Sequence, residues 1–120
     1  KVYPGRSAQD LVPYLNMKGL QGIVLELFGN GNAPTSPDFL KIINKLAKKG
    51  IVIVTVSQYN KLGTAYETDI RLVEAGVLPG RDMTTAAAYT KLAFLLGNVE
   101  DKKLIGQLMD INFRGEVSIR

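Results

Sequence analysis

The chain has 120 residues, of which 46% are hydrophobic and 22% are charged, as is ordinary for a globular domain. It contains no cysteine and no histidine, which excludes disulfides, thiol nucleophiles, His-dependent triads and the usual zinc sites within it. The net charge is +4, but the basic residues do not cluster with aromatic ones, and no apolar run could span a bilayer. We therefore expect neither nucleic acid nor a membrane as a partner.

The first predicted elements lie before residue 28. Residues 2–3 form a short strand, and Ser7 caps a helix that continues to about residue 15, shortened or bent by Pro13. Leu11, Val12 and Leu15 are expected on the buried face of that helix.

Residues 22–28, GIVLELF, form an almost continuous apolar run. Such a run is typical of a parallel strand that is covered on both faces. Glu26 is its one charged residue, so we expect this side chain to reach the strand end, a partner or an interface.

A strand–helix–strand unit follows the loop FGNGNAP at residues 28–34. Ser36 is the predicted N-cap, Pro37 stands in the first turn, and Gly50 ends the helix at the C′ position. Residues 51–56, IVIVTV, are β-branched at nearly every position and form the best predicted strand. The expected buried stripe of the helix is Phe39, Leu40, Ile43, Leu46 and Ala47, with Lys41, Lys45, Lys48 and Lys49 on its polar side and last turn.

The second half of the chain is predicted to be mainly helical. A helix over 68–75 is stopped by Gly76, and an extended piece at 77–78 precedes a turn at Pro79-Gly80. Asp82 or Thr84 caps a helix over 85–96 that ends at residues 97–98. Another helix covers about 99–109, and residues 116–119 form a terminal strand or tail.

The order of these elements predicts the fold class. Strand, helix and strand over 22–56 form a βαβ unit, which places the loops after both strands at the same edge of a parallel sheet. We expect one domain, residues 1–120, with a three-layer α/β/α architecture and a small, mostly parallel sheet of Rossmann-like or flavodoxin-like type.

Two polar segments could carry chemistry. The loop at 29–32, GNGN, either binds an anionic or amide-bearing ligand through backbone N–H groups and amides, or is only a tight turn. It is neither a P-loop nor a dinucleotide fingerprint. Residues 82–85, DMTT, offer a carboxylate beside hydroxyls, but helix capping is the favoured interpretation. No hydroxyl stands beside an evident base, so the chain is predicted to contribute to a ligand site rather than to form a complete enzyme.

Several strings together resemble the C-terminal domain of cytoplasmic (type I) L-asparaginases. The loop GNGNAP at 29–34 resembles that family's G-x-G-N-A-P, and AGVLPGRDMT at 75–84 resembles its A-G-V-I-x-G-x-D-M-T. YPG at 3–5, KGIVIV at 49–54, TKL at 90–92 and RGE at 114–116 match further motifs in the same order. The resemblance covers nearly the whole chain, and its strength lies in the combination.

The resemblance implies an activity that this chain completes but does not perform alone. Family members hydrolyse L-asparagine to L-aspartate and ammonia without metal or cofactor, and their nucleophile lies in a larger N-terminal domain. The chain starts without Met or a signal pattern, so we expect it to be a piece of such a protein, cytoplasmic and inactive alone. Its expected partners are L-asparagine, its own N-terminal domain, and further copies in a dimer or tetramer.

The resemblance also names candidate site residues. Asn32 matches the Asn that reaches the active site of a neighbouring subunit, and it is the main candidate. Asn30, Tyr66 and Glu67 are weaker candidates for substrate contact, and no catalytic or metal-binding residue is expected in this chain.

Two departures and three alternatives accompany this interpretation. Glu26 and Tyr59 stand where some members carry an Arg and a Cys of an allosteric asparagine site, which argues against effector regulation by that route. The alternatives are the equivalent domain of a related amidase, that of a tRNA-dependent amidotransferase subunit, and a binding or interface module without chemistry.

Overall fold

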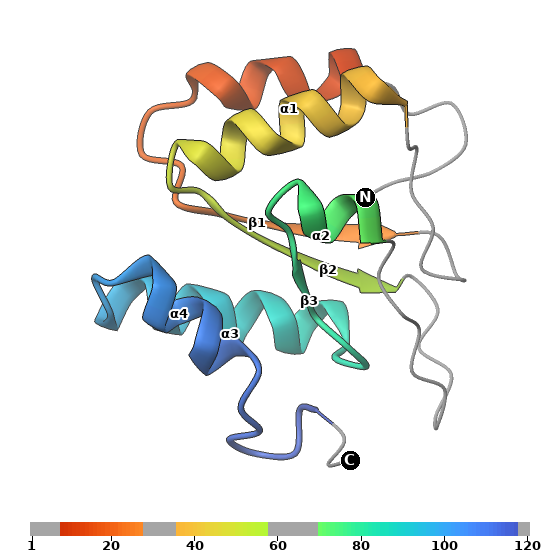
Figure 1. Cartoon of the computed structure of the whole chain (residues 1–120). Helices are drawn as coiled ribbons and strands as arrows, with labels where there is room; N and C mark the ends of the chain where they lie inside the picture. Colours follow the sequence, from red (N-terminus) through yellow and green to blue (C-terminus); the bar gives the residue numbers. More distant parts are fainter. Residues whose placement is uncertain (1–7, 28–35, 58–69, 118–120) are drawn as a thin grey trace.

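The computed structural model describes residues 8–27, 36–57 and 70–117, which form a parallel three-stranded sheet with helices on both faces (Figure 1). The strands are β1 (Gly22–Leu27), β2 (Val52–Ser57) and β3 (Leu78–Pro79), in the order β1-β2-β3. The helices are the 3₁₀ helix η1 (Ala8–Asn16), α1 (Pro37–Lys48), α2 (Ile70–Glu74), α3 (Thr85–Asn98) and α4 (Lys102–Met109). The expected α/β class with a small parallel sheet is confirmed.

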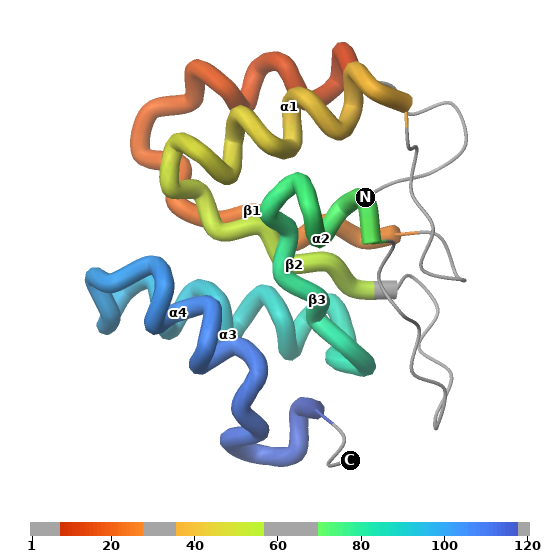
Figure 2. The backbone as a smooth tube through the Cα atoms, in the orientation of Figure 1, coloured from red at the N-terminus to blue at the C-terminus, as the bar shows by residue number. Residues whose placement is uncertain are grey.

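The sheet separates two apolar clusters. Helices η1, α1 and α2 lie over one face, while α3 and α4 run side by side below the other (Figure 2). Successive residues of β2 alternate between them, since Ile53 packs in the first cluster and Val52 and Val54 in the second. The three-layer arrangement therefore follows from strands that are apolar on both sides.

The unit β1-α1-β2 follows the local sequence signals closely. Ser36 accepts a hydrogen bond from the backbone N–H of Phe39 at 3.3 Å, and Pro37 occupies the first turn. Gly50, with φ of +86°, follows the C-cap of α1, a conformation that glycine adopts without a Cβ penalty. β1 then pairs in parallel with β2, from Gly22↔Val52 to Leu27↔Ser57. The predicted cap, helix end and strands are confirmed.

The first predicted helix has a different form. η1 is a 3₁₀ helix around Pro13, and its repeat of three residues per turn places Ala8, Leu11 and Tyr14 on one face. These three side chains belong to or pack against the first cluster, whereas Val12 is exposed. The expectation that Val12 is buried was wrong because it assumed the α-helical period of 3.6.

The turn between α2 and α3 lies at a different position from the predicted one. Pro79 belongs to β3 rather than to the expected Pro79-Gly80 turn, and it pairs with Thr55. A proline fits there because β3 is an edge strand of the described sheet. The turn begins one residue later, where the backbone N–H of Met83 donates to Gly80 O at 3.1 Å.

The two last helices also differ in their bounds. α3 continues through Gly97 to Asn98, because the ladder extends to the bond from Val99 N–H to Leu95 O at 2.8 Å. α4 begins at Lys102, where the Asp101 carboxylate caps it. Glu116 and Val117 form no strand.

The strand expected at 2–3 and residues 68, 69, 118 and 119 lie outside the described ranges. None of the helices in those ranges combines the length and apolar character that a bilayer crossing requires.

Candidate functional site

The carboxyl ends of β1 and β2 lie next to each other. Leu27 and Ser57, the last residues of the two strands, are partners in the parallel register. Segments 28–35 and 58–69 leave from these ends, and the chain returns at Ser36 and Ile70. This register confirms that the strands before the two loops end at the same edge of the sheet. This edge is where open α/β sheets bind ligands.

The four predicted contact residues belong to those two segments. Asn30 and Asn32 lie in segment 28–35, and Tyr66 and Glu67 lie in segment 58–69, all outside the described residues. Tyr59 lies there as well. The assignments of these side chains therefore stay predictions.

Glu26 stands one residue before this edge. Leu25 and Leu27 point into the first cluster and Val24 packs on the second, so strand alternation directs Glu26 toward the side of α3. It is half-buried and pairs in register with Val56. Of the three expected outcomes (a strand end, a partner or an interface), its place as the penultimate residue of β1 agrees with the first, and the other two stay open.

The turn after β3 is fixed by a glycine. The Gly80 N–H donates to Thr55 O at 2.7 Å, and a Cβ on Gly80 would lie 2.2 Å from that same oxygen. Thr84 caps α3 by accepting a hydrogen bond from the Ala87 N–H at 3.1 Å. The capping interpretation of residues 82–85 is confirmed for Thr84, while Asp82 is not the cap.

Lys91 is a buried cation that anchors the segment after α4. Its Nζ donates to the carbonyl oxygens of Met109, at 3.0 Å, and Ile111, and to Glu116 Oε1 at 2.7 Å. Its side chain is only 6% exposed, and Nζ lies 4.6 Å from the centre of the Phe113 ring. All three N–H donors of the ammonium are used, so Lys91 has no proton donor left for a ligand.

Glu116 completes this anchor. Besides the Lys91 ammonium, its carboxylate accepts the backbone N–H groups of Phe113, at 2.9 Å, and Arg114, at 2.7 Å. The hydrogen bond from Lys91, followed by that from Phe113, lowers the pKa of Glu116 to about 2 against the opposing effect of burial. The anchor therefore holds a carboxylate that is ionised at neutral pH.

The motifs TKL and RGE thus meet in space, which the sequence interpretation missed. Lys91 and Glu116 are 25 residues apart, and no local pattern predicts a contact over that separation. The sequence did contain one indication that Lys91 is special, because it is the only charged residue of α3.

A second ion pair joins the turn after β3 to the same segment. Arg81 Nε contacts Asp110 Oδ1, and the two side chains are 38% and 54% exposed. The Arg81 hydrogen bond lowers the pKa of Asp110 and, reciprocally, raises that of Arg81. Because water screens an exposed pair, this contact is expected to be weak.

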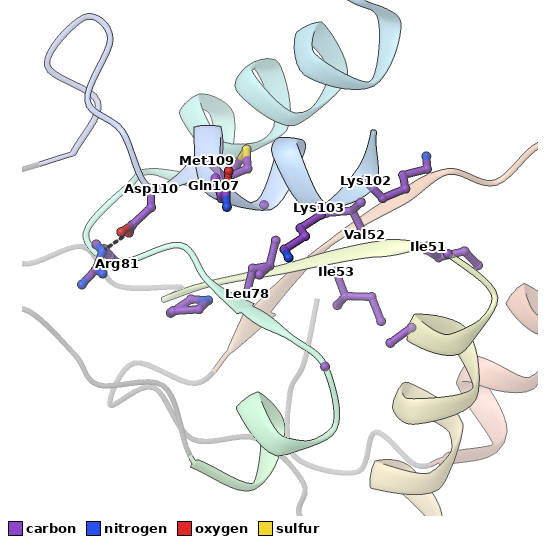
Figure 3. A pocket seen from close by; sticks show the side chains of 15 residues that line it. Ile51, Val52, Ile53, Leu78, Arg81, Lys102, Lys103, Gln107, Met109 and Asp110 are labelled. Carbon is purple, nitrogen blue, oxygen red and sulfur yellow. Dashed lines mark hydrogen bonds and ion pairs between the residues drawn. The ribbon is translucent and has the colours of Figure 1, made fainter. Parts of the chain in front are cut away.

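A groove of about 700 Å³ lies along the sheet beside α4 (Figure 3). Ile51, Val52, Ile53 and Leu78 contribute to its sheet side, and Lys103 of α4 extends toward that side. Val52 and Ile53 belong to the amino-terminal half of β2 and Leu78 belongs to β3, whereas Ile51 directly precedes β2. The described part of this lining therefore lies toward the start of β2, whereas the predicted site is expected beyond the strand ends at Leu27 and Ser57.

The described residues hold no evident catalytic group. Within residues 8–27, 36–57 and 70–117, no three His, Cys, Asp or Glu side chains gather as metal ligands. The buried ionic groups are engaged with each other, and the hydroxyl of Thr84 is engaged in capping. This part of the chain is suited to positioning the two loop segments.

Comparisons with known proteins agree with this arrangement. The family model described as the glutaminase/asparaginase C-terminal domain matches residues 1–109. L-asparaginase 1 of Escherichia coli is 37% identical over 98% of the chain and 35% of its own length. A glutamyl-tRNA(Gln) amidotransferase subunit of Pyrococcus furiosus is 36% identical over 98% of the chain and 27% of its own length. The structure of L-asparaginase I from Vibrio cholerae superposes with a TM-score of 0.85 at 31% identity, over 98% of the chain and 36% of that structure.

The chain spans only about a quarter to a third of these relatives.

Proposed function

The chain belongs to the glutaminase/asparaginase C-terminal domain family, and on that premise we propose that it is the C-terminal domain of an L-asparaginase. In this proposal residues 1–120 are one domain, and a longer protein hydrolyses L-asparagine to L-aspartate and ammonia. The domain completes the substrate site of a neighbouring subunit, and it has no turnover of its own. It requires no metal or cofactor.

The observation that carries the proposal is the register Leu27↔Ser57. It brings the starts of two polar segments together at one end of a rigid sheet. Segment 28–35 contains the loop that resembles the G-x-G-N-A-P motif. The residues on either side of this loop are held by described elements, since β1 ends at Leu27 and Ser36 caps α1. Binding residues are often carried by loops that a scaffold positions in this way.

Asn32 is the proposed substrate contact, with Asn30, Tyr66 and Glu67 as secondary ones. The amide of Asn32 offers two N–H donors and one carbonyl acceptor. It could therefore orient a carboxylate or an amine of the substrate, or hold a catalytic side chain of the neighbouring subunit. Each role depends on the N-terminal domain and on assembly into a homo-oligomer.

A domain exchange tests this function. The part of E. coli L-asparaginase 1 that aligns with this chain is replaced by residues 1–120. We expect the exchanged enzyme to release ammonia from L-asparagine, and the 120-residue chain alone to release none above the buffer blank. Turnover by the chain alone would contradict the two-domain proposal, and a folded but inactive exchanged enzyme would contradict the asparaginase assignment.

A second candidate is the corresponding domain of a glutamyl-tRNA(Gln) amidotransferase. The P. furiosus amidotransferase protein matches as well as the E. coli asparaginase does, at 36% against 37% identity. The same exchange, made in the P. furiosus protein, distinguishes the candidates. Full activity in the amidotransferase background, together with none in the asparaginase background, would favour the second.

A further inference from the structure

The groove beside α4 combines an apolar floor with positive charge. Its volume of about 700 Å³ lies in the range of small-molecule sites, which is about 300–1,000 Å³. On the sheet side the floor is apolar, since Ile51, Val52 and Leu78 contribute only hydrocarbon side chains. Lys103 extends from α4 toward these residues (Figure 3). An apolar pocket with a few polar groups is typical of sites that bind small molecules.

The charges of the groove do not cancel. In the described part of the chain, its lining contains the cations Arg81, Lys102 and Lys103 and one carboxylate, that of Asp110. Asp110 is paired with Arg81, and the carboxylate of the neighbouring Asp101 caps α4. Neither Lys102 nor Lys103 forms an ion pair with any described residue. These two lysines are therefore available to an anion that binds in the groove.

Gly106 keeps the groove open on the side of α4. Glycine in the interior of a helix is less stable than alanine, and α4 spans Lys102–Met109. A Cβ on Gly106 would lie 3.5 Å from Leu78 Cδ1, which is an ordinary van der Waals contact. Packing therefore does not require glycine at this position. Its effect is to leave the space between α4 and Leu78 free of a side chain, as a ligand in that space would need.

We propose that the groove binds a small molecule with an apolar body and one anionic group, a class that includes fatty acids. The apolar body lies on Ile51, Val52 and Leu78, where it is removed from water. The anionic group accepts a charge-assisted hydrogen bond from the ammonium of Lys103. The inference does not rest on asparagine hydrolysis, because the floor of the groove lies toward the start of β2 and the proposed substrate contacts lie beyond its carboxyl end.

The edge of β3 disfavours a segment of the longer protein as the occupant. Extended segments dock at a sheet edge through main-chain hydrogen bonds. Successive N–H groups of a strand point to opposite sides, and the Gly80 N–H points to Thr55 O of β2. The outward N–H would therefore belong to residue 79, which is a proline and has none. A small molecule that binds through apolar contact and one ion pair needs no such donor.

Calorimetric titration of the 120-residue chain tests the proposal with two probes, decanoate and decyltrimethylammonium. The two have alkyl chains of similar length and opposite charges. We expect saturable binding of decanoate with one site per chain, and a Kd for decyltrimethylammonium that is about 10-fold higher or more. A factor of about 10 is the scale of one charge-assisted hydrogen bond.

Two variants separate charge from space. Lys103→Met is expected to raise the Kd of decanoate by about 10-fold, while Lys41→Met, on the exposed side of α1 and outside the groove, leaves it unchanged. Gly106→Leu places a side chain in the groove and is expected to raise the Kd of both probes. Gly97→Leu is its control, because a Cβ on Gly97 of α3 would meet nothing within 4 Å. Thermal unfolding verifies that each variant is folded.

The absence of saturable binding would overturn the proposal. Equal affinity for the two probes would do so as well, as would a Kd of decanoate that Lys103→Met leaves unchanged or that Lys41→Met raises as much.

The same titration of the domain-exchanged E. coli enzyme distinguishes a ligand site from a surface that the rest of a longer protein covers. We expect decanoate to bind the exchanged enzyme with the Kd of the chain, whether or not that enzyme hydrolyses asparagine. Loss of binding in the exchanged enzyme would contradict the proposal, because it would show that the groove is closed by the remainder of the protein.

Discussion

The segment after α4 and the carboxyl end of the sheet both contain residues that resemble asparaginase motifs, but the two regions differ in what those residues do. After α4, the ammonium of Lys91 and the carboxylate of Glu116 are bonded to each other and to the backbone. At the carboxyl end of the sheet, the described residues are the ends of two strands, and two polar segments follow them in the chain.

This difference shows that a matched motif is not by itself a site. TKL and RGE are explained by the anchor of the last segment, and the threonine of DMT by the cap of α3. The GNGNAP loop lies outside the described residues, so its role stays a prediction from the resemblance. The predicted substrate contacts, Asn30, Asn32, Tyr66 and Glu67, belong to segments 28–35 and 58–69.

The largest effect on stability is expected at Lys91. Lys91→Met keeps most of the side-chain volume but leaves the Glu116 carboxylate, whose side chain is only 13% exposed, without its cation. Breaking a buried ion pair from one side typically costs about 3–5 kcal/mol of unfolding free energy. Urea unfolding measures this loss, with Lys41→Met on the exposed side of α1 as the control, which is expected within about 0.5 kcal/mol of the parent. A loss below about 1 kcal/mol would mean that Lys91 does not anchor the segment.

An intermediate effect is expected from the titration of Glu116. Its pKa is lowered in the folded chain from the ordinary 4.5 to about 2, so the folded state favours the ionised form. This contribution is complete above the unfolded pKa and is lost as the pH falls from about 4.5 to about 2. Unfolding free energies measured across that range should fall more steeply for the parent than for Glu116→Gln. Parallel curves would contradict the role of this carboxylate.

The smallest effect is expected at the exposed pair. Arg81→Gln removes the contact with Asp110 and is expected to cost at most about 1 kcal/mol, because water screens both side chains. Arg81 has a φ of +55°. Glutamine, like arginine, carries a Cβ, so the substitution does not change the backbone strain at this position. A double-mutant cycle with Asp110→Asn at low and high salt isolates the pair, whose coupling should shrink as salt is added. A coupling free energy between Arg81 and Asp110 as large as the loss of unfolding free energy in Lys91→Met would contradict the expectation that the exposed pair is the weaker one.

Much of the fold could be predicted because its signals are local. The Ser36 cap, the left-handed Gly50 and the β-branched run of β2 each act within a few residues, and each was placed correctly. The errors have equally physical causes. Pro13 lies inside a 3₁₀ helix, and the hydrogen-bond ladder of α3 continues past Gly97 to the N–H of Val99.

The candidate site could be predicted only in part. Parallel pairing follows from the βαβ pattern, and this places both loop segments at one edge. The anchor between Lys91 and Glu116 could not be found in this way, because it joins side chains 25 residues apart. The residue type does not show whether a lysine is buried or exposed, because burial depends on tertiary packing.

One measurement tests most directly whether the carboxyl end of the sheet is the functional region. In the domain-exchanged E. coli enzyme, Asn32→Ala is compared with the parent exchange by kcat/KM for L-asparagine and by Tm. We expect kcat/KM to fall by about 100-fold, the scale of a misplaced reacting group, with an unchanged Tm. An unchanged kcat/KM in the folded variant would contradict the assignment of Asn32 and with it the functional role of the loop.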